Sequence, residues 1–477
     1  MIKKISELIN IDPRYDRQIS GLSLDSRHLA ENNIFCACRG TQSHAQTYLE
    51  MALQKPIAAV FLEEEGEIFL KNNIPCIPYP NLTKELGILA AKFYDFPTKE
   101  MRVIGVTGTN GKTSISHFIA QHLPQPCGLL GTLGNGVYGE LISGKFTTPF
   151  GIELQEVFYN LKLKNIKNTV MEVSSHALEQ HRTAGINFEI GIFTNLTRDH
   201  LDYHGTMENY GAAKAKLFQD YPLKTVILNL DDLFSQHLLQ IVPQINVLTY
   251  SLNNSQASIF CNKINLLPNG YQLEVSTPLG IVKTKIKLIG DFNVSNILAA
   301  ISAFIALEMP LKDIEKKLFQ TQAVAGRMEL FQSPNYAPII IDYAHTPDAL
   351  EKALQAARKH CNGKLWCIFG CGGDRDQGKR PLMGEIAEKY ADQIILTNDN
   401  PRHEIPKQII SDIKTGLKSY SFLTILDRKQ AISHALKNAE KNDLILLAGK
   451  GHETYQQIGD DFIHYSDRET VQQLLGL

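Results

Sequence analysis

The chain has 477 residues, which is too long for one hydrophobic core, so we expect roughly two to four domains. Its apolar content of 43% and charged content of 21% are ordinary for a globular protein. The formal net charge of -2 argues against a general binder of nucleic acid or of a membrane surface.

The N-terminus and the cysteines point to a cytoplasmic protein. MIKKISELIN has neither a long apolar core nor a small-residue cleavage site, so we expect no signal peptide. No apolar run approaches the ~20 residues that a membrane span needs. The 8 cysteines fit no zinc or redox spacing, and we expect reduced core thiols.

Three blocks of alternating strands and helices follow one another. Residues 1–97 contain apolar runs such as NIFCACRG, residues 98–324 contain NTVMEV and FEIGIF, and residues 325–477 contain PIIIDYA and DQIIL. Such alternation implies right-handed crossovers and largely parallel sheets. Only residues 271–290 have the period-two pattern of a small antiparallel hairpin. We predict an α/β protein with a small N-terminal domain, a central domain with this hairpin, and a C-terminal Rossmann-like domain.

GVTGTNGKTS, residues 105–114, follows a strand and opens a helix, as a phosphate-binding loop requires. Its glycines let backbone N–H groups turn toward phosphates, while Lys112 suits β/γ charge and the Thr113 hydroxyl suits Mg²⁺. Gly105 is one residue too far upstream for the usual spacing, and the local unit starts at Gly108. The pattern predicts a central ATPase domain of the P-loop type. The alternative is a plain glycine-rich turn, and the loop alone leaves kinase, motor, switch and ligase open.

A second group of polar residues follows later strands of the central block. Glu172 ends a strand and suits a magnesium ligand, while His200, His204 and Lys214 lie in or beside a helix. A free ammonium repels Mg²⁺, but carbamylation by CO₂ turns the amine into a carboxylate-like ligand. From the residues alone, a solvated surface lysine is the simpler interpretation of Lys214, and a structural role is the simpler one for His204.

TNDNPRHE, residues 397–404, comes directly after the apolar run DQIIL, so it should lie beyond a strand's carboxyl end, where open α/β sheets bind ligands. Asp399 and Arg402 lie close together in this patch. A local turn held by an Asp399–Arg402 contact is the structural alternative to a ligand site.

Taken together, these motifs resemble the Mur ligases, and within that family the diaminopimelate-adding branch. The resemblance covers nearly the full length and rests on nine motifs in family order: GTNGKT, EVSSHAL, NLTRDHLDYHG, GDFNVSN, AGRME, IDYAHTPDAL, GCGGDRDQGKRPLMG, DNPR and GKGHE. It implies a cytoplasmic ligase of peptidoglycan synthesis. Such an enzyme uses ATP to join meso-2,6-diaminopimelate to UDP-N-acetylmuramoyl-L-alanyl-D-glutamate through an acyl phosphate.

The resemblance also implies the phosphoryl-transfer site. It assigns Lys112, Glu172, His200 and Lys214 to catalysis. It implies one Mg²⁺ held by Thr113 and Glu172, and a second held by His200 and Lys214, the latter modified as a CO₂-derived carbamate. The implied ATP contacts are Gly108, Thr109, Asn110, Gly111, Lys112, Thr113, Ser114, Asn293, Asn296, Arg327 and Asp342.

Two further sets of contacts follow by similarity. The implied contacts for the UDP-muramoyl dipeptide are Leu24, Ser26, Thr41, Gln42, Ser43, Thr147, Thr148, Ser174, Gln180 and Arg182. Ser174 has a strand-end turn as its structural alternative, and Arg182 a surface cation. The implied contacts for diaminopimelate are Arg375, Asp399, Asn400, Pro401, Arg402, Gly449 and Glu453.

Arg402, the arginine of DNPR, is expected to select diaminopimelate over lysine as the amine substrate. Diaminopimelate carries a distal carboxylate that lysine lacks, and the planar fork of Arg402 can bind a carboxylate in two places. A lysine-adding or D-Ala-D-Ala-adding sister ligase, a folylpolyglutamate synthetase, and a non-ligase ATP-binding module are the alternatives. We expect small-molecule substrates, a monomer, and neither nucleic-acid nor membrane partners.

Overall fold

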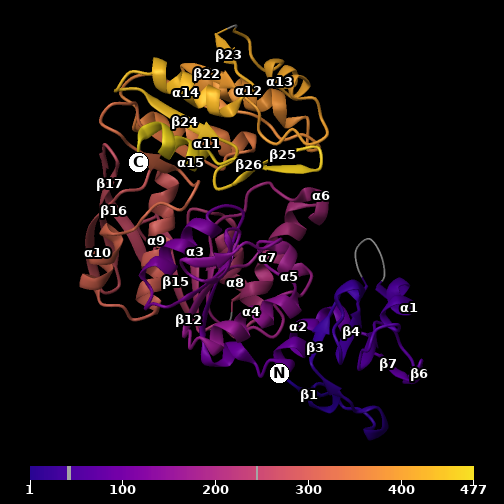
Figure 1. Ribbon diagram of the computed structural model, residues 1–477. Helices are drawn as coiled ribbons and strands as arrows, with labels where there is room; N and C mark the ends of the chain where they lie inside the picture. Colours follow the sequence, from indigo (N-terminus) through magenta and orange to yellow (C-terminus); the bar gives the residue numbers. More distant parts are fainter. Residues whose placement is uncertain (40–44, 243–244, 420) are drawn as a thin grey trace. The chain divides into compact units, whose positions relative to one another are not determined.

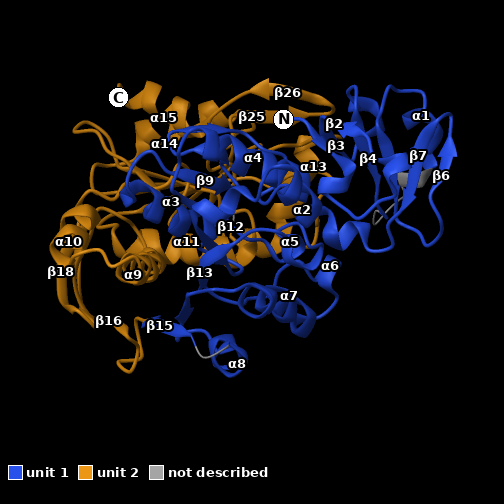
Figure 2. Ribbon diagram, turned by 90° about the horizontal axis from the view of Figure 1, so that it is seen from below, with its two compact units in different colours: residues 1–250 blue, residues 251–477 orange. Residues whose placement is uncertain are grey.

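The computed structural model describes residues 1–39, 45–242, 245–419 and 421–477. They form two compact units, residues 1–250 (the first unit) and residues 251–477 (the second unit), which Figure 2 colours separately. The division falls inside the predicted central block, so the three-domain division at residues 97 and 324 stays a prediction. In the described part of the chain, no helix is both long and apolar enough to cross a membrane.

The first unit begins with a small sheet in the order β3-β4-β5-β7-β6, parallel except for β6 (Figure 1). Alternate residues of β4 enter two core clusters, Ile34 and Cys36 on one face and Phe35 and Ala37 on the other. A strand buried on both faces reads as a continuous apolar run, as NIFCA does. The elements of this part are β1 (Lys3–Lys4), β2 (Gln18–Ile19), β3 (Gly21–Ser23), β4 (Asn33–Ala37), α1 (Leu49–Ala52), β5 (Ala59–Leu62), β6 (Phe69–Lys71), β7 (Ile74–Pro78) and α2 (Leu82–Phe93).

The rest of the first unit contains a larger sheet whose strands run in the order β11-β10-β9-β12-β8-β13-β14-β15. From β9 to β15 the strands are parallel, whereas β10 and β11 pair antiparallel. The strands are β8 (Arg102–Thr107), β9 (Gly128–Gly131), β10 (Gly134–Val137), β11 (Glu140–Ile142), β12 (Asn168–Glu172), β13 (Phe188–Phe193), β14 (Thr225–Asn229) and β15 (Asn246–Ser251). The helices are α3 (Lys112–His122), α4 (Gly151–Leu163), α5 (Ser175–Glu179), α6 (Leu201–His204), α7 (Met207–Gln219) and α8 (Phe234–Ile241).

Strand β8 lies where the chain reverses its direction across this sheet. After β8 the chain builds β9 and β12 on one side, and then β13 and β14 on the other. Open α/β sheets bind ligands outside the carboxyl ends of the strands at such a reversal. The topology therefore brings together the residues that follow β8, β12 and β13.

The second unit begins with three antiparallel strands, β16 (Ile259–Leu267), β17 (Gly270–Thr277) and β18 (Gly280–Ile286), followed by α9 (Asp291–Ala306) and α10 (Leu311–Phe319). Along β17, buried Tyr271, Leu273 and Val275 alternate with more exposed residues. This is the period-two pattern that predicted a hairpin over 271–290, and the prediction is confirmed.

A second sheet in this unit runs in the order β19-β20-β24-β21-β22-β23, parallel from β20 to β23, with β19 antiparallel. Helices cover both faces, since one core cluster includes Leu354, Met383 and Ile413, while the other includes Ile432 and Val471. The strands are β19 (Glu329–Phe331), β20 (Ile339–Asp342), β21 (Leu365–Phe369), β22 (Gln393–Leu396), β23 (Phe422–Thr424), β24 (Leu444–Ala448), β25 (Tyr455–Ile458) and β26 (Asp461–His464). The helices are α11 (Pro347–Lys359), α12 (Lys379–Tyr390), α13 (Pro406–Lys414), α14 (Arg428–Asn438) and α15 (Asp467–Leu475).

The predicted fold class is confirmed. The protein is a mixed α/β protein with mostly parallel sheets and small antiparallel hairpins. The helices of the second sheet in the second unit lie on both of its faces, as a Rossmann-like sheet requires (Figure 1).

Candidate active site

The loop between β8 and α3 requires glycine at two positions. Gly108 and Gly111 have φ of 147° and 89°, conformations that other residues rarely adopt. A Cβ atom on Gly108 would lie 1.9 Å from the Thr194 hydroxyl oxygen. The Lys112 ammonium donates hydrogen bonds of 2.9 Å to the carbonyl oxygens of Gly108 and Thr109. The predicted phosphate-loop residues 108–114 thus form one turn at the start of α3.

Asn195, which follows β13, fastens this loop to the neighbouring strand. Its side-chain oxygen accepts a 3.0 Å hydrogen bond from the Asn110 N–H, and its amide nitrogen donates to the Asn110 carbonyl at 3.1 Å. Its backbone oxygen also accepts from the Thr109 N–H at 2.8 Å. The predicted site set omits Asn195, although its place directly after a buried strand is a usable signal.

Glu172 lies at the end of β12 and is buried, with 1% of its surface exposed. One carboxylate oxygen accepts a 2.9 Å hydrogen bond from the Thr113 hydroxyl, and the other accepts a 2.8 Å hydrogen bond from the Thr132 N–H. These oxygen donors suit Mg²⁺, which usually takes one or two carboxylates and completes its shell with phosphate and water. Among the described residues, no group of three or more His, Cys, Asp or Glu side chains could hold a metal ion.

Lys214, on α7, is buried against the phosphate loop. Only 1% of its surface is exposed, and its ammonium donates a 2.9 Å hydrogen bond to the Gly108 carbonyl oxygen. Burial, together with the nearby charge of Lys112, holds the pKa of Lys214 well below its usual value. The surface-lysine interpretation is therefore wrong.

His200 precedes α6 in a left-handed conformation, with φ of 52°. Burial lowers the pKa of its imidazole, an effect that nearby Asp199 opposes. Tyr210 contacts both metal-site candidates, because its ring centre lies 6.1 Å from that of His200 and 4.2 Å from the Lys214 ammonium. His204 instead lies 2.9 Å from the Ser175 hydroxyl, in agreement with its expected structural role.

The residues predicted to hold the dipeptide gather at the end of β12. The Thr148 hydroxyl accepts a 3.2 Å hydrogen bond from the Ser174 N–H, and the Thr148 carbonyl accepts a 3.1 Å one from Arg182. Arg182 also donates to the Gln180 side-chain oxygen at 2.6 and 2.9 Å. Thr147 lies beside them, 3.1 Å from the Thr132 hydroxyl. The Ser174 side chain caps α5, as its structural alternative expects.

A cavity of about 700 Å³ opens between the first sheet and the start of α4. The predicted uridine contacts Leu24 and Ser26 line it, as do Phe150 and Ile152 at the start of α4. Thr41, Gln42 and Ser43, predicted to contact the same group, lie outside the described residues.

In the second unit, the four predicted ATP contacts lie at the start of α9 and around the end of β20. Asn293 and Asn296 are buried at the start of α9, joined by a 3.0 Å hydrogen bond from the Asn296 amide to the Asn293 side-chain oxygen. Asp342 ends β20 and accepts a 2.8 Å hydrogen bond from the Met328 N–H. Burial raises the pKa of Asp342, while nearby Arg327 opposes the rise.

The DNPR patch follows β22, as predicted, and Arg402 does not pair with Asp399. Its backbone is left-handed, with φ of 51°. The Arg402 guanidinium donates a 2.7 Å hydrogen bond to the Gly373 carbonyl and a 3.2 Å one to the Gln457 side-chain oxygen. The Arg402 N–H donates to the Gln457 carbonyl at 3.1 Å. The alternative of a turn held by an Asp399–Arg402 contact is therefore wrong.

Two neighbouring loops complete the predicted amino-acid pocket. Arg375 is exposed on the loop after β21. That loop packs closely on the DNPR loop, since a Cβ atom on Gly373 would lie 1.9 Å from the Pro401 carbonyl oxygen. Gly449 follows β24, and a Cβ atom there would lie 2.7 Å from an Asp399 carboxylate oxygen. Any side chain at 449 would therefore crowd Asp399.

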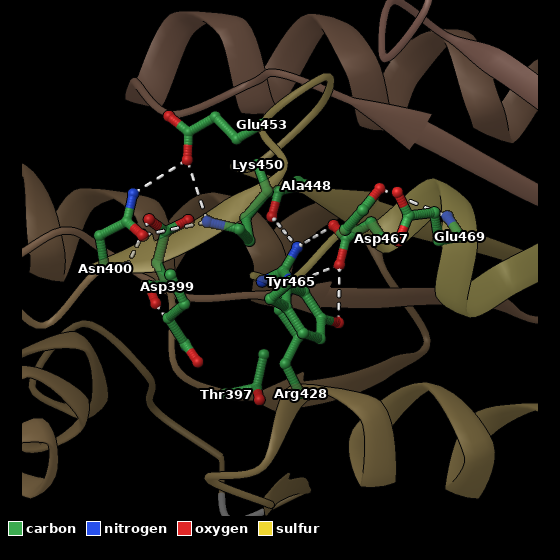
Figure 3. A network of polar contacts seen from close by, with 12 residues as sticks. Thr397, Asp399, Asn400, Arg428, Ala448, Lys450, Glu453, Tyr465, Asp467 and Glu469 are labelled. Atoms are coloured by element: carbon green, nitrogen blue, oxygen red, sulfur yellow. Dashed lines mark hydrogen bonds and ion pairs between the residues drawn. The ribbon is translucent and has the colours of Figure 1, made fainter. Parts of the chain in front are cut away.

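Asn400 and Glu453 belong to a hydrogen-bonded network that also contains the buried Lys450, a residue absent from the predicted set (Figure 3). The Lys450 ammonium donates to Glu453 at 2.9 Å and to the Asn400 side-chain oxygen at 3.1 Å. The Asn400 amide also donates to Glu453 at 2.9 Å. The place of Lys450 inside GKGHE is a signal that could have included it.

Comparisons with known proteins find Mur ligases over most of the chain. Residues 106–304 match the family described as Mur ligase middle domain, and residues 326–451 match the one described as Mur ligase, glutamate ligase domain. A Coxiella burnetii protein named UDP-N-acetylmuramoyl-L-alanyl-D-glutamate--2,6-diaminopimelate ligase is 46% identical over 96% of this chain and 96% of the relative. A Pseudomonas aeruginosa protein of the same name is 44% identical, with 96% of each chain covered.

Solved structures extend the likeness to the fold. One described as a UDP-N-acetylmuramoyl-L-alanyl-D-glutamate--2,6-diaminopimelate ligase has a TM-score of 0.76 at 35% identity, covering 100% of this chain and 99% of that one. MurF from Acinetobacter baumannii has a TM-score of 0.66 at 19% identity, covering 97% and 94%. Folylpolyglutamate synthase from Mycobacterium tuberculosis has a TM-score of 0.63 at 16% identity, covering 78% and 92%. The last two share the fold alone.

Proposed function

The chain belongs to the Mur ligase family, and we propose that it uses ATP to join meso-2,6-diaminopimelate to UDP-N-acetylmuramoyl-L-alanyl-D-glutamate. This reaction forms an amide bond and extends the peptide of a peptidoglycan precursor. We place it in the cytoplasm, where ATP and nucleotide-linked sugars are available. Relatives and a solved structure named for this activity support the assignment.

The choice of amine rests on the hydrogen-bond partners of the Arg402 guanidinium. A guanidinium has five N–H donors. Only two hydrogen bonds from the Arg402 guanidinium reach described residues, to Gly373 and Gln457, and the Asp399 carboxylate is not a partner. The remaining donors suit a ligand carboxylate, which diaminopimelate has at its distal end and lysine lacks. An unpaired carboxylate binder disfavours lysine by about 1–3 kcal/mol.

Lys112, Thr113 and Glu172 support phosphoryl transfer in this proposal. The dipeptide's γ-carboxylate attacks the γ-phosphate, giving an acyl phosphate and ADP, and the incoming amine then displaces phosphate to form the amide. Lys112 neutralises phosphate charge from the start of α3. Thr113 and Glu172 fit Mg²⁺ through their adjacent buried oxygens. When bound, the ion further neutralises the phosphates.

Lys214 and His200 are the proposed holders of a second Mg²⁺. The buried amine of Lys214 has a lowered pKa, which favours the neutral form that attacks CO₂. The new N–C bond forms with loss of a proton and gives an anionic carbamate. As an amine, Lys214 only donates to the loop carbonyl, whereas a carbamate offers oxygen ligands.

The remaining predicted contacts keep their proposed roles. The cavity lined by Leu24 and Ser26 suits the uridine diphosphate end. Thr147, Thr148, Ser174, Gln180 and Arg182 suit the muramoyl dipeptide, because they gather beside Glu172. Asn293, Asn296, Arg327 and Asp342 are proposed as further ATP contacts.

Mass spectrometry of the product tests the proposal. Incubation with ATP, the UDP-muramoyl dipeptide and diaminopimelate should convert the dipeptide into a species heavier by one diaminopimelate minus water. A wild-type protein that leaves the dipeptide unchanged with any amino acid would contradict the ligase assignment.

A further inference from the structure

A fully buried lysine lies in the predicted amino-acid pocket without an assigned role. Lys450 follows the carboxyl end of β24, and none of its surface is exposed. A buried ammonium is tolerated only where partners compensate for its lost hydration. Its two side-chain hydrogen bonds go to Glu453 at 2.9 Å and to Asn400 at 3.1 Å.

The two oxygens of the Glu453 carboxylate differ in their partners. Oε2 accepts from the Lys450 ammonium and from the Asn400 amide, each at 2.9 Å. Oε1 has no hydrogen-bond partner among the described side chains and backbone groups. Figure 3 shows this second oxygen pointing away from Lys450 and Asn400. One oxygen is therefore fixed by the protein, and the other remains available as an acceptor.

Asn400 is held as firmly as Glu453. Its side-chain oxygen accepts from the Lys450 ammonium at 3.1 Å and from the Gln457 N–H at 3.0 Å. Its amide nitrogen gives one N–H to Glu453, which leaves one N–H for a ligand. The Asn400 amide cannot flip without breaking these bonds. Its N–H is therefore a fixed donor to the Glu453 carboxylate.

A second buried ion pair anchors the strand that leads to Lys450. Arg428 and Asp467 pair through hydrogen bonds of 2.8 and 2.7 Å, and neither is more than 2% exposed. Arg428 also donates a 2.9 Å hydrogen bond to the Ala448 carbonyl, two residues before Lys450 (Figure 3). The backbone that carries Lys450 is thus tied to α14 and α15.

We propose that Lys450, assisted by Asn400, is a positioning residue that holds Glu453 so that its free oxygen accepts the distal ammonium of diaminopimelate. This inference rests on the proposed function and deepens it. Arg402 binds the distal carboxylate and Glu453 binds the distal ammonium. The pocket therefore contacts both charges at the zwitterionic end of diaminopimelate. A carboxylate with one oxygen already fixed loses less freedom when it binds a ligand.

A comparison of two amines in the wild-type and variant proteins tests this proposal. L-2-aminopimelate keeps the reacting amine and the distal carboxylate but lacks the distal amino group. In the wild-type enzyme, its kcat/KM should be at least tenfold below that of diaminopimelate. In Lys450→Met, the ratio of kcat/KM for diaminopimelate to kcat/KM for L-2-aminopimelate should fall below threefold. The reason is that Glu453 no longer offers a fixed acceptor to the distal ammonium. A merely structural role would lower kcat/KM for both amines equally and keep the ratio.

Lys429→Met is the matched control, since this exposed lysine on α14 bonds Gln473 at 3.0 Å, and it should keep the wild-type ratio. Lys450→Leu, which also removes the donor, replaces Lys450→Met if the latter fails to fold. Glu453→Gln should also reduce the ratio below threefold. A tenfold ratio that persists in folded Lys450 variants, or a wild-type ratio below twofold, would overturn the proposal. No turnover of diaminopimelate by the wild type would instead reject the proposed function.

Discussion

The Lys214 ammonium lies 2.9 Å from the carbonyl oxygen of Gly108, so a buried lysine on α7 touches the phosphate loop. Gly108 also accepts a hydrogen bond from Lys112, so two lysines converge on one carbonyl oxygen. Their mutual repulsion adds to burial in lowering the pKa of Lys214. The lowered pKa favours the neutral amine, the form that can react with CO₂ to give a carbamate.

Lys214→Ala should abolish measurable ligation, because the proposed second metal loses its anionic ligand. Short carboxylic acids added to the variant should restore part of the activity by occupying the vacated space. Phosphate release from ATP measures both effects. Lys216→Ala is the matched control, because Lys216 lies on the same helix and pairs with Glu179 at 2.7 Å. Wild-type activity in Lys214→Ala would refute the bridging role.

The carbamate itself should be observable. Protein equilibrated with ¹³C-bicarbonate should show a carbamate carbon resonance that is absent in Lys214→Ala and retained in Lys216→Ala. The lowered pKa of Lys214 makes its neutral amine more abundant than that of an ordinary lysine at the same pH, which favours carbamate formation. Acidification protonates the amine and should remove the signal. An identical resonance in wild type and Lys214→Ala would place the carbamate elsewhere.

Thr113→Val should weaken the use of Mg²⁺ by about tenfold, because it removes the hydroxyl that bonds Glu172 at 2.9 Å. Titration of activity against Mg²⁺ at saturating ATP measures the change. Thr113→Ser keeps a hydroxyl and should retain most of the affinity. Equal Mg²⁺ requirements in Thr113→Val and the wild type would exclude Thr113 from the metal site.

Arg402→Ala should lower kcat/KM for diaminopimelate by roughly 10²-fold, which corresponds to about 3 kcal/mol. The KM for ATP should change little, because Arg402 follows β22 and its guanidinium bonds, among the described residues, the neighbouring loop and hairpin. Arg358→Ala removes a half-buried arginine on α11 that pairs with Asp392 at 2.7 Å, and it serves as the control. Equal losses for both substrates would indicate a folding defect instead.

Arg428→Met should reduce the free energy of unfolding by about 3–5 kcal/mol, because it leaves the buried Asp467 carboxylate unpaired. Urea unfolding, followed by a spectroscopic signal from the second unit, measures this loss of stability. The double variant Arg428→Met/Asp467→Leu should recover much of this loss, since neither charge of the buried pair remains. A single variant as stable as the wild type would show that the pair contributes little.

Much of the fold could be predicted because its strands are apolar runs. Strands β4 and β22 were expected from NIFCACRG and DQIIL, and the patch after β22 was expected at a strand's carboxyl end. The surface interpretation of Lys214 is wrong, although its position in the sequence carries a signal of burial. It lies four residues after Tyr210 and three before Leu217, both buried, so the helical period places it on the buried face of α7.

Contacts between distant segments could not be predicted from local pattern. Arg402 bonds Gln457, which lies 55 residues later in β25. Lys450 reaches Asn400 across 50 residues, and nothing in the spacing of GKGHE and DNPR indicates that bond. These partners are set by which strand ends meet at one edge of the sheet.

Phosphate release from ATP in the presence of UDP-N-acetylmuramoyl-L-alanyl-D-glutamate, comparing meso-diaminopimelate with L-lysine, tests the central claim most directly. Release with diaminopimelate and not with lysine is the predicted result, because only diaminopimelate offers Arg402 a distal carboxylate. Equal or greater release with lysine would keep the ligase and contradict the role of Arg402, and no release with either amine would contradict the ligase itself.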